Sequence, residues 1–89
     1  MTEAAKPFGS IEDTQEFIAL LEEAIEEAIL DVGSELERAR TETEDRRSAA
    51  LNLATYKLTQ LRVHIGKSRR IVNDLRSIRR LLSNERQPQ

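Results

Sequence analysis

The sequence has no cysteine and no tryptophan, and its 89 residues include only one tyrosine, two phenylalanines, three glycines and two prolines. Without cysteine, no disulfide and no thiolate metal site can stabilise this short chain. No apolar run approaches the roughly 18 residues that a membrane span requires. The first ten residues also lack the apolar segment of a secretory signal. We therefore expect a soluble, cytoplasmic protein of one small domain.

The composition that remains is typical of long helices. Charged residues make up 34% of the chain, and Leu, Ile and Ala supply most of its apolar side chains, a combination that favours helices over strands. A chain of this length buries only a modest core. We therefore expect an all-α protein that gains further stability by forming a homodimer.

Two segments of the chain carry a heptad pattern, in which core positions recur in alternating steps of three and four residues. The positions of the first segment are Ile11, Thr14, Ile18, Leu21, Ile25, Ala28, Val32, Glu35 and Ala39. Those of the second segment are Leu51, Ala54, Leu58, Leu61, Ile65, Ser68, Val72, Leu75, Arg79 and Leu82. The sequence therefore predicts two long helices.

The two heptad patterns do not fit on one straight helix. The first pattern would continue at position 42, and the nine residues from there to Leu51 put the second pattern half a turn out of phase, at about 100° per residue. A chain reversal between the segments removes this conflict. We therefore predict a coiled-coil-like antiparallel hairpin, in which Ile18 faces Leu75 and Leu21 faces Val72.

The predicted hairpin divides the chain into a helix over 10–43, a turn at about 44–47 and a helix over 48–83. These elements form one helical domain, 10–84. We expect a flexible tail before it, 1–9, and a disordered C-terminus after it, 85–89.

Gly33 offers a competing position for the break. Glycine often ends a helix, and Ser34 with Glu37 has the spacing of a capping box that starts the next one. The alternative fold is therefore a short helix over 10–32 followed by one long helix over 34–83. The first heptad pattern keeps its phase across Gly33, which favours the hairpin.

Several large apolar residues lie beside the heptad positions and widen both apolar faces beyond the width that one partner helix covers. We therefore predict that two hairpins associate into a four-helix bundle. The residues assigned to this self-association are Phe17, Ile29, Leu36, Ile71 and Ile78.

The two halves of the chain have opposite charge. Residues 1–45 hold fourteen acidic and three basic residues, whereas residues 46–89 hold eleven basic and two acidic residues. The favoured interpretation is that the two helices neutralise each other, with the region of Glu22 opposite Arg69. The alternative is that the second helix binds phosphate groups of a nucleic acid. The candidate residues for that role are Arg62, Arg69, Arg70, Arg76 and Arg80.

No motif in the sequence predicts catalysis, a cofactor or a metal site. Gly66-Lys67-Ser68 resembles the end of a phosphate-binding loop, but Leu61 stands where that motif needs another glycine. Leu61 also stands three residues before His64, where a di-iron Glu-x-x-His motif needs glutamate. The acidic residues from Glu22 to Glu27 are expected to form a solvated helix face.

These observations predict a non-enzymatic interaction or scaffold protein that acts through helix–helix association. We expect a second copy of the chain, or another protein with a helical face, as the partner. Nucleic-acid binding is the alternative function. Membrane binding is not expected, because the basic segment brings neither tryptophan nor phenylalanine to an interface.

Overall fold

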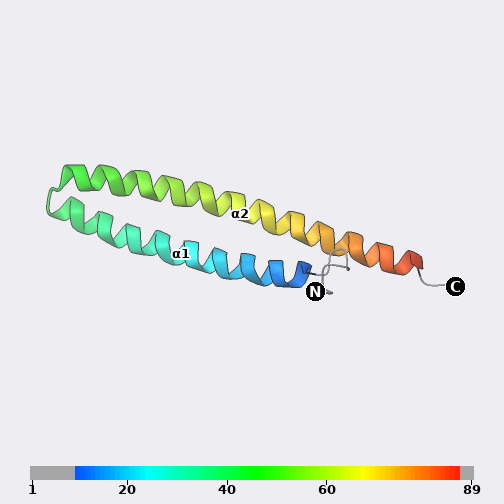
Figure 1. Ribbon diagram of the computed structural model, residues 1–89. Coiled ribbons are helices and arrows are strands. Elements are labelled where there is room, and N and C mark those ends of the chain that lie inside the picture. The colour runs from blue at the N-terminus through cyan, green and yellow to red at the C-terminus, as the bar shows by residue number, and fades with distance from the viewer. Residues whose placement is uncertain (1–9, 87–89) are drawn as a thin grey trace.

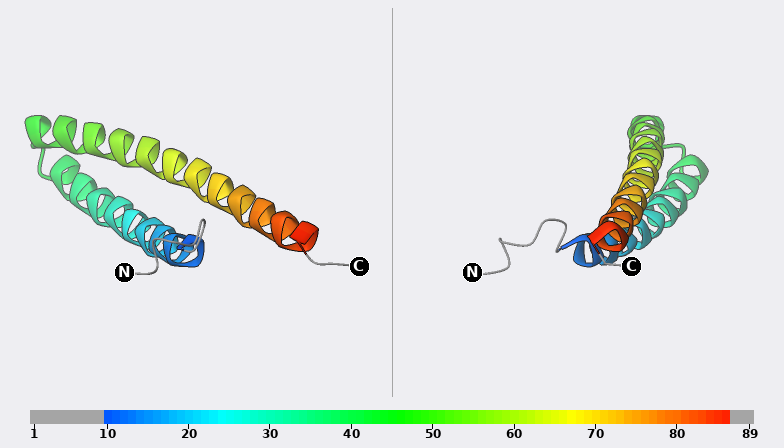
Figure 2. Two further views of the ribbon diagram at one scale, coloured as in Figure 1. Left: turned by 45° about the vertical axis from the view of Figure 1, so that its right-hand side comes forward. Right: turned by 90° about the vertical axis from the view of Figure 1, so that its right-hand side faces the viewer.

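The computed structural model describes residues 10–86, with side chains described for residues 10–84. It consists of helix α1, Ile11–Thr41, and helix α2, Asp45–Arg86. The helices lie side by side and run in opposite directions (Figures 1 and 2). The all-α antiparallel hairpin predicted from the sequence is therefore confirmed, whereas the predicted tail 1–9 and residues 87–89 lie outside the described residues.

α1 continues through Gly33 without a break, so the alternative fold with separate helices before and after this residue is wrong. A glycine inside a helix costs only about 1 kcal/mol relative to alanine. A helix of 31 residues that packs along its whole length against α2 tolerates that cost.

The turn occupies residues 42–44, slightly before the predicted 44–47. The backbone N–H of Thr43 donates to the carbonyl of Arg40, and the N–H of Glu44 donates to the carbonyl of Ala39. This pair of bonds is a Schellman motif, which satisfies two carbonyls at the end of α1. The carbonyl of Glu44 then accepts a hydrogen bond from the N–H of Ser48 and starts α2.

The bounds of both helices differ slightly from those predicted from heptad phase. α1 ends at Thr41 instead of 43, and α2 begins at Asp45 instead of 48. α2 also extends to Arg86 instead of 83, because Ser83 and Asn84 lower helix propensity only slightly and no proline occurs in α2. Residues 85 and 86 therefore belong to the helix and not to the predicted disordered end.

The hairpin core is a single row of side chains between the helices. The buried residues are Ile11, Ile18, Ile25, Ala39 and Val72, and all five lie at predicted heptad positions. Ile65 and Leu75 pack against the cluster that contains Ile18 and Val72. The turn lies nearer the N-terminus than predicted. Each residue of α1 therefore faces a residue of α2 that comes a few positions earlier in the chain than the one predicted to face it.

The hairpin is one layer of two helices, with principal extents of 70 × 26 × 14 Å. Its Cα radius of gyration is 20.1 Å, whereas a compact domain of this length has a radius of about 12 Å. α2 has 42 residues against 31 in α1, so its C-terminal turns project beyond the start of α1 (Figure 1).

Candidate functional site: the two flanks of the hairpin

One flank of the hairpin, here called the polar flank, carries hydrogen bonds and ion pairs between the helices. Arg62 Nη1 lies 3.0 Å from Glu26 Oε2, and Arg69 Nε lies 3.1 Å from Glu22 Oε2. Further along, Gln15 Nε2 donates to Asn73 Oδ1 at 2.6 Å. These contacts confirm the predicted opposition of Glu22 and Arg69.

Glu12 closes the open end of the hairpin by binding Arg79. Arg79 Nη1 donates to Glu12 Oε1 at 2.9 Å, and Arg79 Nη2 donates to Glu12 Oε2. The Nε of Arg76 lies 4.0 Å from the same carboxylate. The hydrogen bonds from Arg79 lower the pKa of Glu12 to about 2, because they stabilise its charged form. This contact explains how a guanidinium occupies a heptad position.

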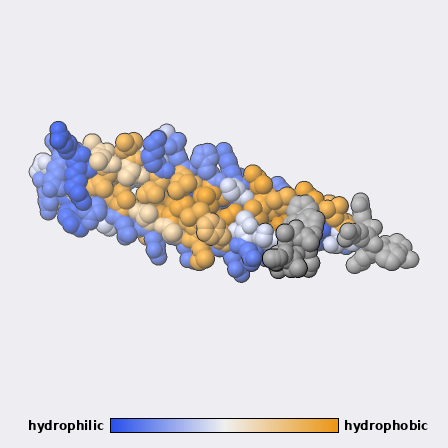
Figure 3. Space-filling model, viewed as in Figure 1, coloured by the Kyte–Doolittle hydropathy of each residue, from blue (hydrophilic) through white to orange (hydrophobic). Residues whose placement is uncertain are grey.

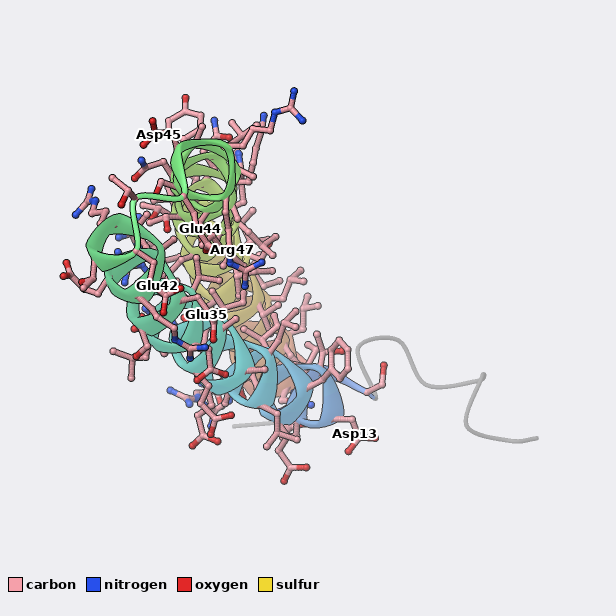
Figure 4. All side chains as sticks on the ribbon, turned by 90° about the vertical axis from the view of Figure 1, so that its left-hand side faces the viewer. Asp13, Glu35, Glu42, Glu44, Asp45 and Arg47 are labelled. Atoms are coloured by element: carbon pink, nitrogen blue, oxygen red, sulfur yellow. The ribbon has the colours of Figure 1, made fainter. Side chains whose placement is uncertain are left out.

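Glu35 connects the two helices at the turn end of the hairpin, as Glu12 does at the open end. Its carboxylate accepts hydrogen bonds from Arg47 of α2 at 2.8 Å and from Arg38 of α1 at 2.9 Å. The hydrogen bond from Arg47 lowers the pKa of Glu35 below its usual value, and the positive charge of Arg38 lowers it further. In the end-on view of Figure 4, the Glu35 and Arg47 side chains point toward each other across the turn end.

The five predicted phosphate-binding residues fall into two groups in the structure. Arg62, Arg69 and Arg76 lie beside carboxylates of α1. Arg70 and Arg80 are exposed and form no ion pair within 4.0 Å among residues 10–84. The structure therefore brings no continuous row of unpaired arginines together on α2 in the part of the chain that it describes.

The opposite flank of the hairpin is apolar. Ile71 lies two residues after Arg69, and Phe17 lies two residues after Gln15, so each points about 200° away from the polar flank. Phe17, Ile71 and Ile78 retain 64%, 59% and 45% of their surface. The apolar strip is defined by the exposed apolar residues at this flanking heptad position and at the adjoining core position: Phe17, Ala24, Leu61, Ile71, Ile78 and Leu82. The exposed His64, seven residues before Ile71, also lies at the flanking position.

The apolar strip crosses both helices. Leu21, Ala28 and Leu75 lie at neighbouring heptad positions, are half-buried, and connect the strip to the core. The space-filling view in Figure 3 shows a hydrophobic surface along the middle of the molecule, with hydrophilic residues along its edges. Several of the exposed large apolar side chains therefore gather in one strip, whereas others, such as Leu30 and Val63, lie outside it.

The five residues predicted for self-association do not share one face. Phe17, Ile71 and Ile78 belong to the apolar strip. Ile29 and Leu36 follow Glu22 by seven and fourteen residues, which places them on the polar flank, where both are half-buried. The prediction treated all flanking apolar residues alike because it did not separate the two sides of each heptad pattern.

Leu61 and Leu82 were predicted as core residues, but both are exposed. Arg79 already contacts Glu12 in the first turn of α1, so Leu82, three residues further along α2, lies near or beyond the start of α1 and remains exposed. Leu61 lies fourteen residues before Leu75, at the core position that adjoins the strip, and it remains exposed there. A search for apolar residues on only one side of the heptad pattern would have assigned both to the strip.

The described residues contain no group of three or more His, Asp or Glu side chains arranged to hold a metal ion. Within residues 10–86, neither helix combines the length and the apolar character needed to cross a bilayer. No protein-family model, curated protein or solved structure matches this chain.

Proposed function

We propose that this chain is a non-enzymatic interaction or scaffold protein that acts by helix–helix association, and that two hairpins form a four-helix bundle through the apolar strip. The observation that carries the proposal is the exposed row of large apolar residues along one flank of a single-layer hairpin. Domains normally bury such a face against a second layer. A second pair of helices supplies that layer.

The exposed surface of the molecule supports this proposal. The hairpin exposes 7200 Å², whereas a compact protein of 10.2 kDa exposes about 5,300 Å². The difference of about 1,900 Å² per chain exceeds the roughly 800 Å² that each partner buries in a stable protein–protein interface. Association through the strip would remove the most apolar part of this surface from water.

Nucleic-acid binding is not proposed, because three of the five candidate arginines already lie within 4.0 Å of carboxylates of α1. A cytoplasmic location remains a prediction from the sequence.

The proposal is tested by sedimentation equilibrium at tens of micromolar protein. We expect a mass of twice 10.2 kDa. Changing Ile71 and Ile78 together to Ser should weaken association by at least about 100-fold, because each is buried twice in a symmetric dimer. Val63→Ser is the matched control. Val63 is 51% exposed on the same helix, but it lies outside the strip.

A monomeric wild-type chain at this concentration would contradict the proposal. Equal weakening by Val63→Ser and by the double variant would show that the strip is not the interface.

A further inference from the structure

Two charged residues continue the apolar strip toward the turn. Asp31 follows Phe17 by fourteen residues, and Lys57 precedes Ile71 by fourteen, so both have the heptad positions of the strip. Both are exposed, and neither forms an ion pair within 4.0 Å among residues 10–84. This differs from the polar flank, where opposite charges are already paired inside the hairpin.

The two helices also differ in total charge. α1 carries ten acidic and two basic residues, whereas α2 carries eleven basic and three acidic residues. The ion pairs of the polar flank use only part of this charge. The remainder, which includes Asp31 and Lys57 at the strip, favours a partner surface with the opposite arrangement of charge.

A second copy can cover the strip with twofold symmetry in two ways. If the symmetry axis runs along the hairpin, both turns lie at the same end, and α1 packs against α2 of the partner. If the axis runs across the hairpin, the turns lie at opposite ends, and each helix packs against its own counterpart.

We propose that the strip is covered by a second copy in the first arrangement, with both turns at one end of the bundle. This inference rests on the proposed function and adds the orientation of the partner. Each acidic α1 then has only basic α2 helices as neighbours. The second arrangement places acidic beside acidic and basic beside basic helices, and like charges across an interface oppose association.

The same-end arrangement also gives Asp31 a partner. The ion pairs Glu26–Arg62 and Glu35–Arg47 bracket Asp31 on α1 and Lys57 on α2, so the two residues lie at similar heights along the hairpin. A symmetry axis along the hairpin preserves height. Asp31 therefore faces the partner's Lys57, and symmetry makes this contact twice.

The orientation is tested by a distance measurement between two spin labels. The chain has no cysteine, so Arg46→Cys introduces a single labelling site in the first turn of α2. With the turns at one end, we expect a label–label distance of about 30 Å or less, since neighbouring helices lie 8–10 Å apart. With the turns at opposite ends, the distance exceeds about 45 Å, the length of α1 at 1.5 Å per residue.

A long distance in a dimeric sample overturns the orientation and leaves the proposed function standing. A sample with the mass of a monomer overturns both.

Charge reversal gives an independent test of the same arrangement. Asp31→Lys should weaken the dimer about threefold or more, because two exposed ion pairs become repulsive contacts. Adding Lys57→Asp to this variant should restore association. Glu23→Lys changes the net charge equally at an exposed position far from the strip, and it should leave association unchanged. Failure of the double variant to recover, or an equal effect of Glu23→Lys, overturns the assigned contact.

Discussion

The two flanks of the hairpin run along the same pair of helices, but they differ in the contacts that their side chains make within the chain. On the polar flank, arginines of α2 reach carboxylates of α1 at Glu22 and Glu26. On the apolar flank, Phe17 and Ile71 project from the same stretch of the molecule and remain mostly exposed. The polar side chains of one flank therefore find partners within a single chain, whereas the apolar side chains of the other flank remain mostly exposed.

The two flanks hold interactions of different strength. Exposed ion pairs contribute only about 0–1 kcal/mol each, but together they favour the antiparallel pairing of an acidic and a basic helix. Burying one large apolar side chain contributes about 1.5–3 kcal/mol. We infer that the polar flank fixes the register of the hairpin and that the apolar flank drives its association.

The largest expected effect comes from breaking the core row on which both flanks depend. Ile25 retains only 4% of its surface, so Ile25→Ala should lower the free energy of unfolding by about 2–4 kcal/mol through lost packing. Urea unfolding followed by circular dichroism at fixed protein concentration measures this change. Leu30→Ala, at a side chain of the same helix that is 70% exposed, should change stability by less than about 0.5 kcal/mol.

A smaller effect of opposite sign is expected at Gly33. Gly33 follows Glu26 by seven residues and so lies toward the polar flank, where a Cβ atom would have no atom within 4 Å. Gly33→Ala should therefore raise the free energy of unfolding by about 1 kcal/mol, as measured by urea unfolding. Association should not change, because the partner is expected on the other flank.

Ala19→Gly is the matched control, since Ala19 lies fourteen residues before Gly33 and is exposed. It should lower stability by about 1 kcal/mol. If Gly33→Ala instead weakens association, a helix of the partner packs closely against the polar flank. The assignment of association to the apolar flank alone is then wrong.

The helices and their antiparallel pairing could be predicted from the sequence because both depend on a long periodic pattern. All five buried residues, including Ile18 and Val72, were among the predicted heptad positions. The exact turn could not be found in this way, since heptad phase fixes only the faces of the helices. Thr43 has a φ of 56°, a left-handed conformation that usually selects glycine. Threonine gives no such signal in the sequence.

The charged residues around the turn also indicate where the two helices end, which the heptad pattern alone does not. Arg38 and Arg40 lie in the last turn of α1, and Asp45 lies in the first turn of α2. Basic residues are favourable at the C-terminus of a helix and acidic residues at its N-terminus. Reading these charges as helix ends would have placed the turn close to residues 42–44.

The candidate site could be predicted only in part. Phe17, Ile71 and Ile78 were named from the sequence because they lie beside the heptad positions. The division into two flanks depends on the side of the heptad pattern on which each residue lies, and the prediction did not separate these sides. Ile29 and Leu36 follow a core position by one residue, whereas Phe17 precedes one, so they lie on the polar flank, on the same side of α1 as Glu22.

The smallest expected effect concerns the polar flank and depends on pH. The pKa of Glu12 is about 2 in the folded chain against a usual value of 4.5, so the carboxylate stabilises the fold when it is ionised. This contribution is fully present above pH 4.5 and is lost as the pH falls toward 2. Glu12→Gln removes it, so the stability of the variant should decrease less steeply between pH 4.5 and 2.

Urea unfolding at a series of pH values measures this difference, and Glu16→Gln is the matched control. Glu16 is an exposed carboxylate near Glu12 on α1 that forms no ion pair within 4.0 Å among residues 10–84. The effect of Glu12→Gln should also shrink in high salt, because salt screens exposed charges. If both variants flatten the pH profile equally, the contact between Glu12 and Arg79 does not hold the open end of the polar flank.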